Sequence, residues 1–157
     1  MTWIKPTAFT TLLFASLFLI TSCKKDAASK KVTFYSRTGI VLSGTLNVPA
    51  SASTATGSMD VTFDEASKLI TYKVTWSGLT GNPTGFSVYG LAPAGFPAGI
   101  VQAISISGLK TSGNYSGTLF VDGVYIKEED VLNGLYYIGF RTAAYPAGEI
   151  RGQIVFQ

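Results

Sequence analysis

Residues 57–76 read GSMDVTFDEASKLITYKVTW, and this stretch decides the fold class. Met59, Val61 and Phe63 alternate with polar neighbours, which is the pattern of a strand with one buried face. The polar segment DEASK follows as a turn, and Leu69–Trp76 returns with the composition of a second strand. The stretch therefore predicts an antiparallel β-hairpin.

Short β-branched and aromatic runs, separated by Gly-, Pro- and Asn-rich loops, continue on both sides of this hairpin. They predict further strands at residues 32–37, 40–48, 86–89, 100–107, 115–121, 135–142 and 150–156. The only helix expected is one or two turns within Lys127–Asn133, ended by Gly134. We therefore predict an all-β fold, an antiparallel sandwich or barrel, over residues 32–157.

The first residues have a different composition from the rest. A lysine precedes the apolar run Ala8–Ile20, which is shorter than the roughly 20 residues a membrane-spanning helix needs. Such a run, followed by small residues, is typical of a secretory signal. The sequence Ile-Thr-Ser-Cys at residues 20–23 resembles the bacterial lipobox, which predicts a signal peptide over residues 1–22 and lipidation of Cys23. The alternative is an ordinary secretory signal that ends near a cysteine.

The positive charge of the chain lies outside the predicted domain. The formal net charge is +3, yet residues 32–157 hold seven Lys/Arg and eight Asp/Glu. Four lysines lie in residues 24–31, a segment without bulky apolar residues that we expect to be a flexible tether. These lysines lie either near anionic lipid headgroups or simply in solvent. We expect no nucleic-acid partner, because the domain itself is near neutral.

The residue types limit the chemistry. The chain has no histidine, and its one cysteine is the predicted lipid attachment site. Zinc or copper sites of the usual nitrogen and sulfur type, and Ser-His or Cys-His nucleophiles, are therefore excluded, and we expect no metal and no cofactor. A carboxylate pair for glycoside hydrolysis is still open. The candidate carboxylates are Asp60, Asp64, Glu65, Asp122, Glu128, Glu129, Asp130 and Glu149.

Most of these carboxylates lie in predicted turns, where a solvated charge is the simpler interpretation. Glu128, Glu129 and Asp130 supply oxygen ligands for calcium but lack the spaced pattern of a calcium loop. Glu149 and Arg151 lie two residues apart and so share one face of a strand. We interpret them as a structural ion pair or a clamp bonded to the backbone, with a ligand-facing pair as the alternative.

The segment Gly90–Gly99 contains two prolines and three glycines and is predicted to be a loop. Its apolar residues Leu91 and Phe96, with Ile100 just after it, are either exposed to a partner or folded back over the edge of the sandwich.

Several segments resemble the CHRD (chordin-type) domain. They are Leu42-Ser43-Gly44 with Val48-Pro49, then Trp76-Ser77-Gly78-Leu79, and above all the closing block GEIRGQ at residues 148–153. The resemblance spans about residues 38–157. It implies a Greek-key β-sandwich similar in architecture to the copper-zinc superoxide dismutase barrel, in a family common among exported bacterial proteins of unassigned activity.

The chain departs from the family pattern at its histidines. Ser87 and Tyr89 stand where the family usually carries two histidines, and Arg141 stands at a third. Asn47 replaces an acidic residue that commonly precedes the Val-Pro pair. If the family's histidines form a metal site, this chain has lost it. We expect Ser87, Tyr89 and Arg141 to form a small polar patch instead, with Arg141 stacked on Tyr89.

These observations favour a lipid-anchored β-sandwich of the cell envelope with a non-catalytic binding or structural role. The residues at positions 23–26, CKKD, resemble the start of lipoproteins from Bacteroidetes-type bacteria. We expect an outer-membrane lipoprotein, facing either the periplasm or the exterior. An enzyme related to the superoxide dismutase barrel is the alternative, disfavoured by the absence of histidine. Recognition of an envelope glycan or protein through the loops is a further hypothesis.

Overall fold

The computed structural model describes residues 1–3 and 33–156. The predicted signal peptide, Cys23 and the tether therefore lie outside the described residues, apart from residues 1–3. Residues 33–156 belong to one compact unit. None of the helices in the described part of the chain is long and apolar enough to cross a membrane.

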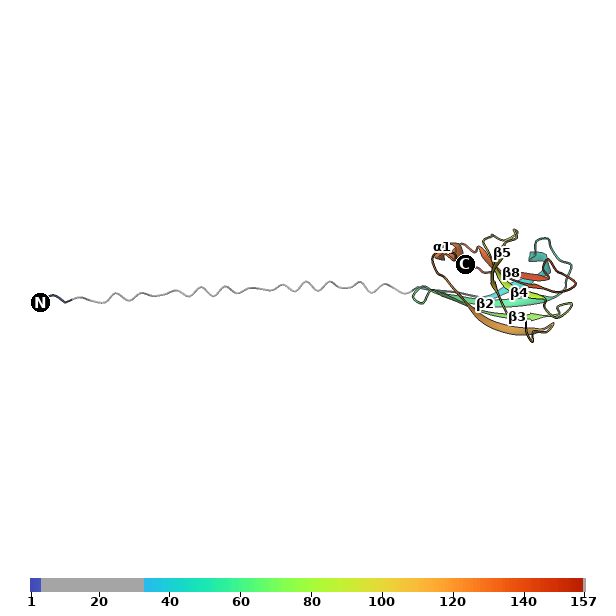
Figure 1. Cartoon of the computed structure of the whole chain (residues 1–157), viewed down its shortest axis with the longest axis horizontal. Coiled ribbons are helices and arrows are strands. Elements are labelled where there is room, and N and C mark those ends of the chain that lie inside the picture. The colour runs from blue at the N-terminus through green and yellow to red at the C-terminus, as the bar shows by residue number, and fades with distance from the viewer. Residues whose placement is uncertain (4–32, 157) are drawn as a thin grey trace. The chain divides into compact units, whose positions relative to one another are not determined.

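Eight strands and two short helical segments make up the domain (Figure 1). The strands are β1 (Phe34–Ser43), β2 (Thr56–Asp64), β3 (Leu69–Ser77), β4 (Gly85–Gly90), β5 (Gly99–Ala103), β6 (Gly113–Phe120), β7 (Tyr136–Arg141) and β8 (Ile150–Gln153). A 3-10 turn, η1 (Gly44–Leu46), follows β1, and the helix α1 (Glu128–Leu132) precedes β7. The all-β prediction, the hairpin of β2 and β3, and the short helix expected within Lys127–Asn133 are confirmed, whereas η1 was not predicted.

All strand pairs are antiparallel, and the strand order is β5-β4-β7-β8-β1-β2-β3-β6. The links from β3 to β4 and from β6 to β7 each join strands that are not neighbours, which makes the topology a Greek key. The ladder between β1 and β8 is minimal, with Ser43 opposite Arg151 as its one residue pair. The fold is therefore two four-stranded sheets joined by a short ladder, curled into a nearly closed barrel.

Side chains rather than a backbone ladder close the barrel between its two edge strands. Gln102 on β5 donates from Nε2 to the carbonyl oxygen of Thr118 on β6, at 3.0 Å. The Tyr72 hydroxyl on β3 donates to Oε1 of the same glutamine, at 3.1 Å. One glutamine side chain thus joins the two open edges, which we call the seam, and uses both ends of its amide group.

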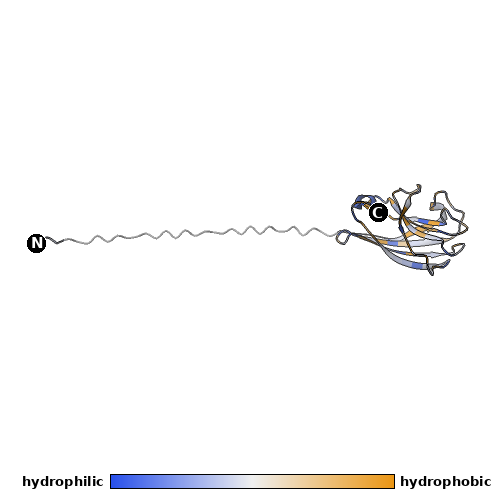
Figure 2. Ribbon diagram, viewed as in Figure 1, coloured by the Kyte–Doolittle hydropathy of each residue, from blue (hydrophilic) through white to orange (hydrophobic). Residues whose placement is uncertain are grey.

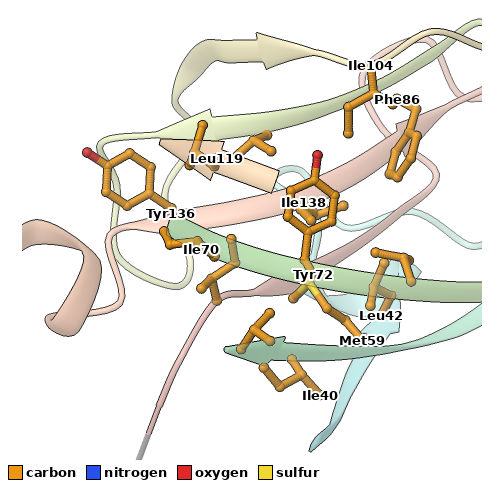
Figure 3. Packing of buried hydrophobic residues seen from close by; sticks show 14 of the residues in the cluster. Ile40, Leu42, Met59, Ile70, Tyr72, Phe86, Ile104, Leu119, Tyr136 and Ile138 are labelled. Atoms are coloured by element: carbon orange, nitrogen blue, oxygen red, sulfur yellow. The ribbon is translucent and has the colours of Figure 1, made fainter. Parts of the chain in front are cut away.

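The core lies between the two sheets, where alternate residues of each strand meet. Figure 3 shows Leu42, Met59 and Ile70 facing Phe86 and Ile138 from the opposite strands. These five residues are each at most 1% exposed. The hydropathy colouring shows the same alternation, with apolar and polar positions following one another along the strands (Figure 2). This alternation fixes which side chains point outward and so positions the candidate site.

Four predicted boundaries were wrong. The strand expected at residues 40–48 ends at Ser43, because Gly44–Leu46 form the 3-10 turn η1. The two strands expected around Thr38-Gly39 are one strand, β1, with a β-bulge between Arg37 and Ile40. Gly39 has a φ of 71° and its N–H donates to the Asp60 carboxylate, so a glycine that resembles a turn residue allows the bulge. The strand expected at residues 100–107 ends at Ala103, and the one expected at 150–156 ends at Gln153.

Candidate functional site

The outer face of β4, β7 and β8 carries the polar residues that the alternation excludes from the core. Phe86 and Val88 on β4 point inward, which places Tyr89 outward. In β7 the inward positions of Ile138 and Phe140 leave Tyr137 and Arg141 outward, and Arg151 lies opposite Gly139 on the same face. Two arginines and two tyrosines from three strands therefore come together.

These four side chains form a layered arrangement. The rings of Tyr89 and Tyr137 stack with centroids 4.8 Å apart and 8° between their planes. Cζ of Arg151 lies 3.5 Å from the Tyr137 centroid, and Cζ of Arg141 lies 5.4 Å from that of Tyr89. Arg141 also donates from Nε to the Tyr89 hydroxyl at 2.9 Å. Each cation–π contact contributes about 0.5–2 kcal/mol, depending on its desolvation.

Arg151 is almost fully buried, at 3% exposure, because the loop at residues 91–98 covers it. Its Nη1 donates to the Phe96 carbonyl at 2.8 Å, and its Nη2 donates to Gln153 Oε1 at 2.8 Å and to the Pro93 carbonyl at 3.4 Å. Burial lowers the pKa of the Arg151 guanidinium, an effect that Tyr137 opposes. The group nevertheless stays charged at neutral pH, because a guanidinium begins from a very high pKa.

The loop at residues 91–98 folds back over the sandwich and also exposes apolar side chains, which were the two alternatives considered from the sequence. It folds over Arg151, and the Gln153 side chain donates to its Ala92 carbonyl at 3.0 Å. It also leaves Leu91 and Phe96 exposed, at 53% and 62%. Its backbone thus completes the wall of the site while its apolar side chains point into solvent.

A pocket of about 110 Å³ lies beside the two arginines. Both stacked tyrosines line it, together with Gly139 and with Asn47 from the segment after β1. Nδ2 of Asn47 is buried and has no hydrogen-bond partner among the described residues. Gly148 allows the Asn47 side chain to lie close to the backbone at residue 148, because a Cβ there would lie 2.6 Å from Asn47 Oδ1. Its φ of 147° is also rarely adopted by residues other than glycine.

The predicted patch forms in part. The structure brings Tyr89 and Arg141 into direct contact. Ser87 lies on the same face, opposite Gly139 and 4% exposed, but it does not line the pocket. Among the described residues, no group of three or more His, Cys, Asp or Glu side chains could hold a metal ion.

A scan of known protein families matches the CHRD domain over residues 38–154. The chain belongs to the CHRD-domain family. Comparison with curated proteins and with solved structures finds no match. The family resemblance expected from the closing block GEIRGQ is thus confirmed, and the CHRD fold here is a β-sandwich.

The ion pair predicted inside that block is not formed in this CHRD domain. Glu149 lies just before β8 begins, so its side chain leaves the strand face that Arg151 occupies. The Glu149 carboxylate is fully buried and accepts hydrogen bonds from the Ser53 and Thr142 hydroxyls and from both the N–H and the hydroxyl of Thr80. Glu149 and Arg151 therefore each bind loop segments rather than each other, which agrees with the alternative prediction of a clamp bonded to the backbone.

Burial alone would raise the pKa of the Glu149 carboxyl. The hydrogen bonds from Thr142, Thr80 and Ser53 outweigh that effect and hold the pKa below its ordinary value. The carboxylate is thus ionised at neutral pH and joins three loops at one end of the CHRD domain. Its bonds are saturated by the protein, which is the pattern of a structural group.

The other candidate carboxylates of the CHRD domain are mostly bound within turns. Asp64 accepts from Ala66 N–H and the Ser67 hydroxyl, and Asp122 accepts from three successive backbone N–H groups. Glu128, the first residue of α1, pairs with Lys68 in the turn between β2 and β3. Sequence reasoning missed the pocket because the burial of Arg151 and the position of Asn47 depend on loops distant in sequence.

Proposed function

We propose that this protein is a lipid-anchored binding domain of the cell envelope that carries out no covalent chemistry. The observation that carries the proposal is the composition of the pocket beside β7. Its walls present guanidinium and amide donors and tyrosine rings, and none of the residues that line it supplies a carboxylate, thiol or aliphatic hydroxyl. The two tyrosine hydroxyls are the groups in this lining that could take part in acid–base or nucleophilic chemistry, and they accept hydrogen bonds from Arg141 Nε and the Ala98 N–H. Donors without a carboxylate or thiol beside them favour a site that holds and orients a ligand.

The anchor rests on the sequence around Cys23. Acylation of this cysteine places the domain at a membrane, and two or more acyl chains suffice for stable attachment. We propose an outer-membrane lipoprotein that faces either the periplasm or the exterior. Its partner is then an envelope glycan or protein, reached across the lysine-rich tether.

The anchor is tested by metabolic labelling with a fatty acid. The wild-type protein should incorporate label and fractionate with the outer membrane, whereas Cys23→Ala should take up none and accumulate as unprocessed precursor. Label in the Cys23→Ala protein would overturn the assignment. Protease treatment of intact cells then separates the two orientations, because only a surface-facing domain is cleaved.

The binding role is tested by screening the wild-type protein and Arg141→Gln in parallel against purified envelope glycans and proteins. Binding that is weaker in Arg141→Gln supports a role for the pocket. Stoichiometric copper or zinc in the purified protein would instead support the metalloenzyme interpretation and contradict the proposal.

A further inference from the structure

The pocket beside β7 concentrates positive charge without a counter-ion. Arg141 and Arg151 both line it, and within residues 33–156 neither guanidinium forms an ion pair. The nearest acidic residue in sequence, Glu149, directs its carboxylate to Ser53, Thr80 and Thr142 instead. Two like charges beside one small pocket repel each other, and an anion between them removes that cost.

The same residues also have unused hydrogen-bond donors. A guanidinium carries five N–H groups, and among the described residues Arg141 uses only its Nε–H, on Tyr89. Nδ2 of Asn47 is buried beside them without an acceptor. A buried donor without an acceptor costs about 1–3 kcal/mol, so the pocket favours a ligand that supplies acceptors.

We infer that Arg141, Arg151 and Asn47 form an oxyanion-binding site that takes one carboxylate or phosphate group. Both groups accept paired hydrogen bonds from a guanidinium fork, which is the common basis of their recognition by arginine. The pocket volume of about 110 Å³ suits one such group rather than a whole sugar ring. The inference rests on the proposed binding function and names the chemistry of its ligand.

A second hollow of about 130 Å³ adjoins the oxyanion site and shares Asn47, Val48 and Arg151 with it. Leu46 and Ala94 line its other side and make it less polar. The ligand is therefore an oxyanion attached to a compact, weakly polar body, as in a short-chain acid.

The test is a titration of the full-length protein in detergent micelles with sodium acetate or sodium phosphate. Sodium chloride at matched ionic strength corrects for screening. The readout is the NMR signal of the arginine Nε–H groups, which reports on the guanidinium directly. We expect saturable shifts at Arg141 and Arg151 with at least one of the two anions, at Kd values of about 1 mM, typical of a single small group.

Arg141→Gln should weaken that binding about 10- to 100-fold, because a hydrogen bond to a charged group contributes about 1.5–3 kcal/mol. Within residues 33–156 the Arg141 side chain bonds only to Tyr89, and the bond that Thr84 N–H donates to residue 141 goes to its backbone carbonyl, so the replacement leaves the covering segment in place. Asn47→Asp should abolish binding by placing a negative charge in the pocket at nearly constant shape. Lys110→Gln is the matched control, since it removes one positive charge from an exposed loop away from the pocket.

A response to acetate alone assigns the site to carboxylates, and a response to phosphate alone assigns it to phosphate groups. Either outcome supports the inference. Absence of saturation by both anions at about 50 mM would overturn it, as would equal shifts in Arg141→Gln and wild type. A protein that binds an envelope glycan but neither anion would retain the proposed function and lose only this inference.

Discussion

Replacing Glu149 with glutamine should destabilise the domain by roughly 2–4 kcal/mol. The carboxylate is fully buried and accepts four hydrogen bonds, from Ser53, Thr142 and twice from Thr80. A hydrogen bond to a charged group contributes about 1.5–3 kcal/mol, against about 0.5–1.5 kcal/mol for a neutral one. Glutamine keeps one acceptor oxygen, and the threonine hydroxyls can rotate to accept from its amide, so the bonds weaken rather than disappear.

The loss should depend on pH in a defined direction. The pKa of Glu149 is lowered in the folded protein from an ordinary value of 4.5. A carboxyl with a lowered folded pKa contributes stability that is present above the unfolded pKa and is lost as the pH falls through the folded pKa. The difference in unfolding free energy between wild type and Glu149→Gln should therefore be largest at neutral pH and should shrink below about pH 4.5.

Urea denaturation followed by the fluorescence of the buried Trp76 measures this difference. Glu129→Gln is the matched control, because that carboxylate is exposed on α1 and its contact with Lys127 is 4.0 Å long. The control should stay within about 0.5 kcal/mol of wild type. A Glu149→Gln protein as stable as this control at neutral pH, or a gap that is the same at pH 7 and pH 3, would refute the reasoning.

Three further substitutions test the packing and the turns. Gly152→Ala should destabilise the domain by about 1–3 kcal/mol in a thermal melt, because the added Cβ would lie 2.9 Å from the Val41 carbonyl oxygen and 2.8 Å from the Leu42 side chain. Gly81→Ala is its control and should be nearly neutral, because a Cβ at position 81 would meet nothing within 4 Å. Gln102→Ala should lower the unfolding free energy by about 1–2 kcal/mol and should speed amide hydrogen exchange in β5 more than in β2. An equal increase of the exchange rate in both strands would contradict the role of the seam. Asp122→Ala should lower the unfolding free energy by about 1–2 kcal/mol in urea denaturation, since Oδ1 of Asp122 accepts from the N–H groups of Val124, Tyr125 and Ile126. An unchanged denaturation midpoint would show that the turn forms without this carboxylate.

The sequence was most informative where local alternation and tertiary structure agree. The hairpin expected at residues 57–76 appears as β2 and β3, because both strands have one buried face and a turn suited to its residues. The errors occur where a local signal has two physical solutions. Gly39 resembles a hairpin turn yet lies in a bulge, and β5 stops at Ala103 because β4, the strand it pairs with, begins at Gly85 and their pairing ends at Ser87 and Ala103.

The site was predictable only in its strand-borne part. Tyr89 and Arg141 lie on the same face of neighbouring strands, as expected, but the register places Tyr89 opposite Tyr137 and Arg141 opposite Gly85. Their contact therefore depends on the length of the arginine side chain, which reaches along the strand to the Tyr89 hydroxyl. The pairing of Glu149 with Arg151 placed Glu149 on the strand face although the predicted strand began at Ile150, and the structure directs its carboxylate to the Ser53, Thr80 and Thr142 hydroxyls instead. The roles of Asn47 and the loop at residues 91–98 depend on how distant segments pack, which a single sequence does not encode in any local pattern.

The short ladder between β1 and β8 has a mechanical consequence. Within each four-stranded sheet, continuous backbone ladders resist sliding, whereas the two sheets share one residue pair on one side and one glutamine on the other. Shear between the sheets is therefore opposed mainly by interlocking core side chains. Asn47 follows β1, and Tyr89 and Arg141 belong to the opposite sheet, so the pocket lies across this joint. Its width depends on how stiffly the core couples the two sheets.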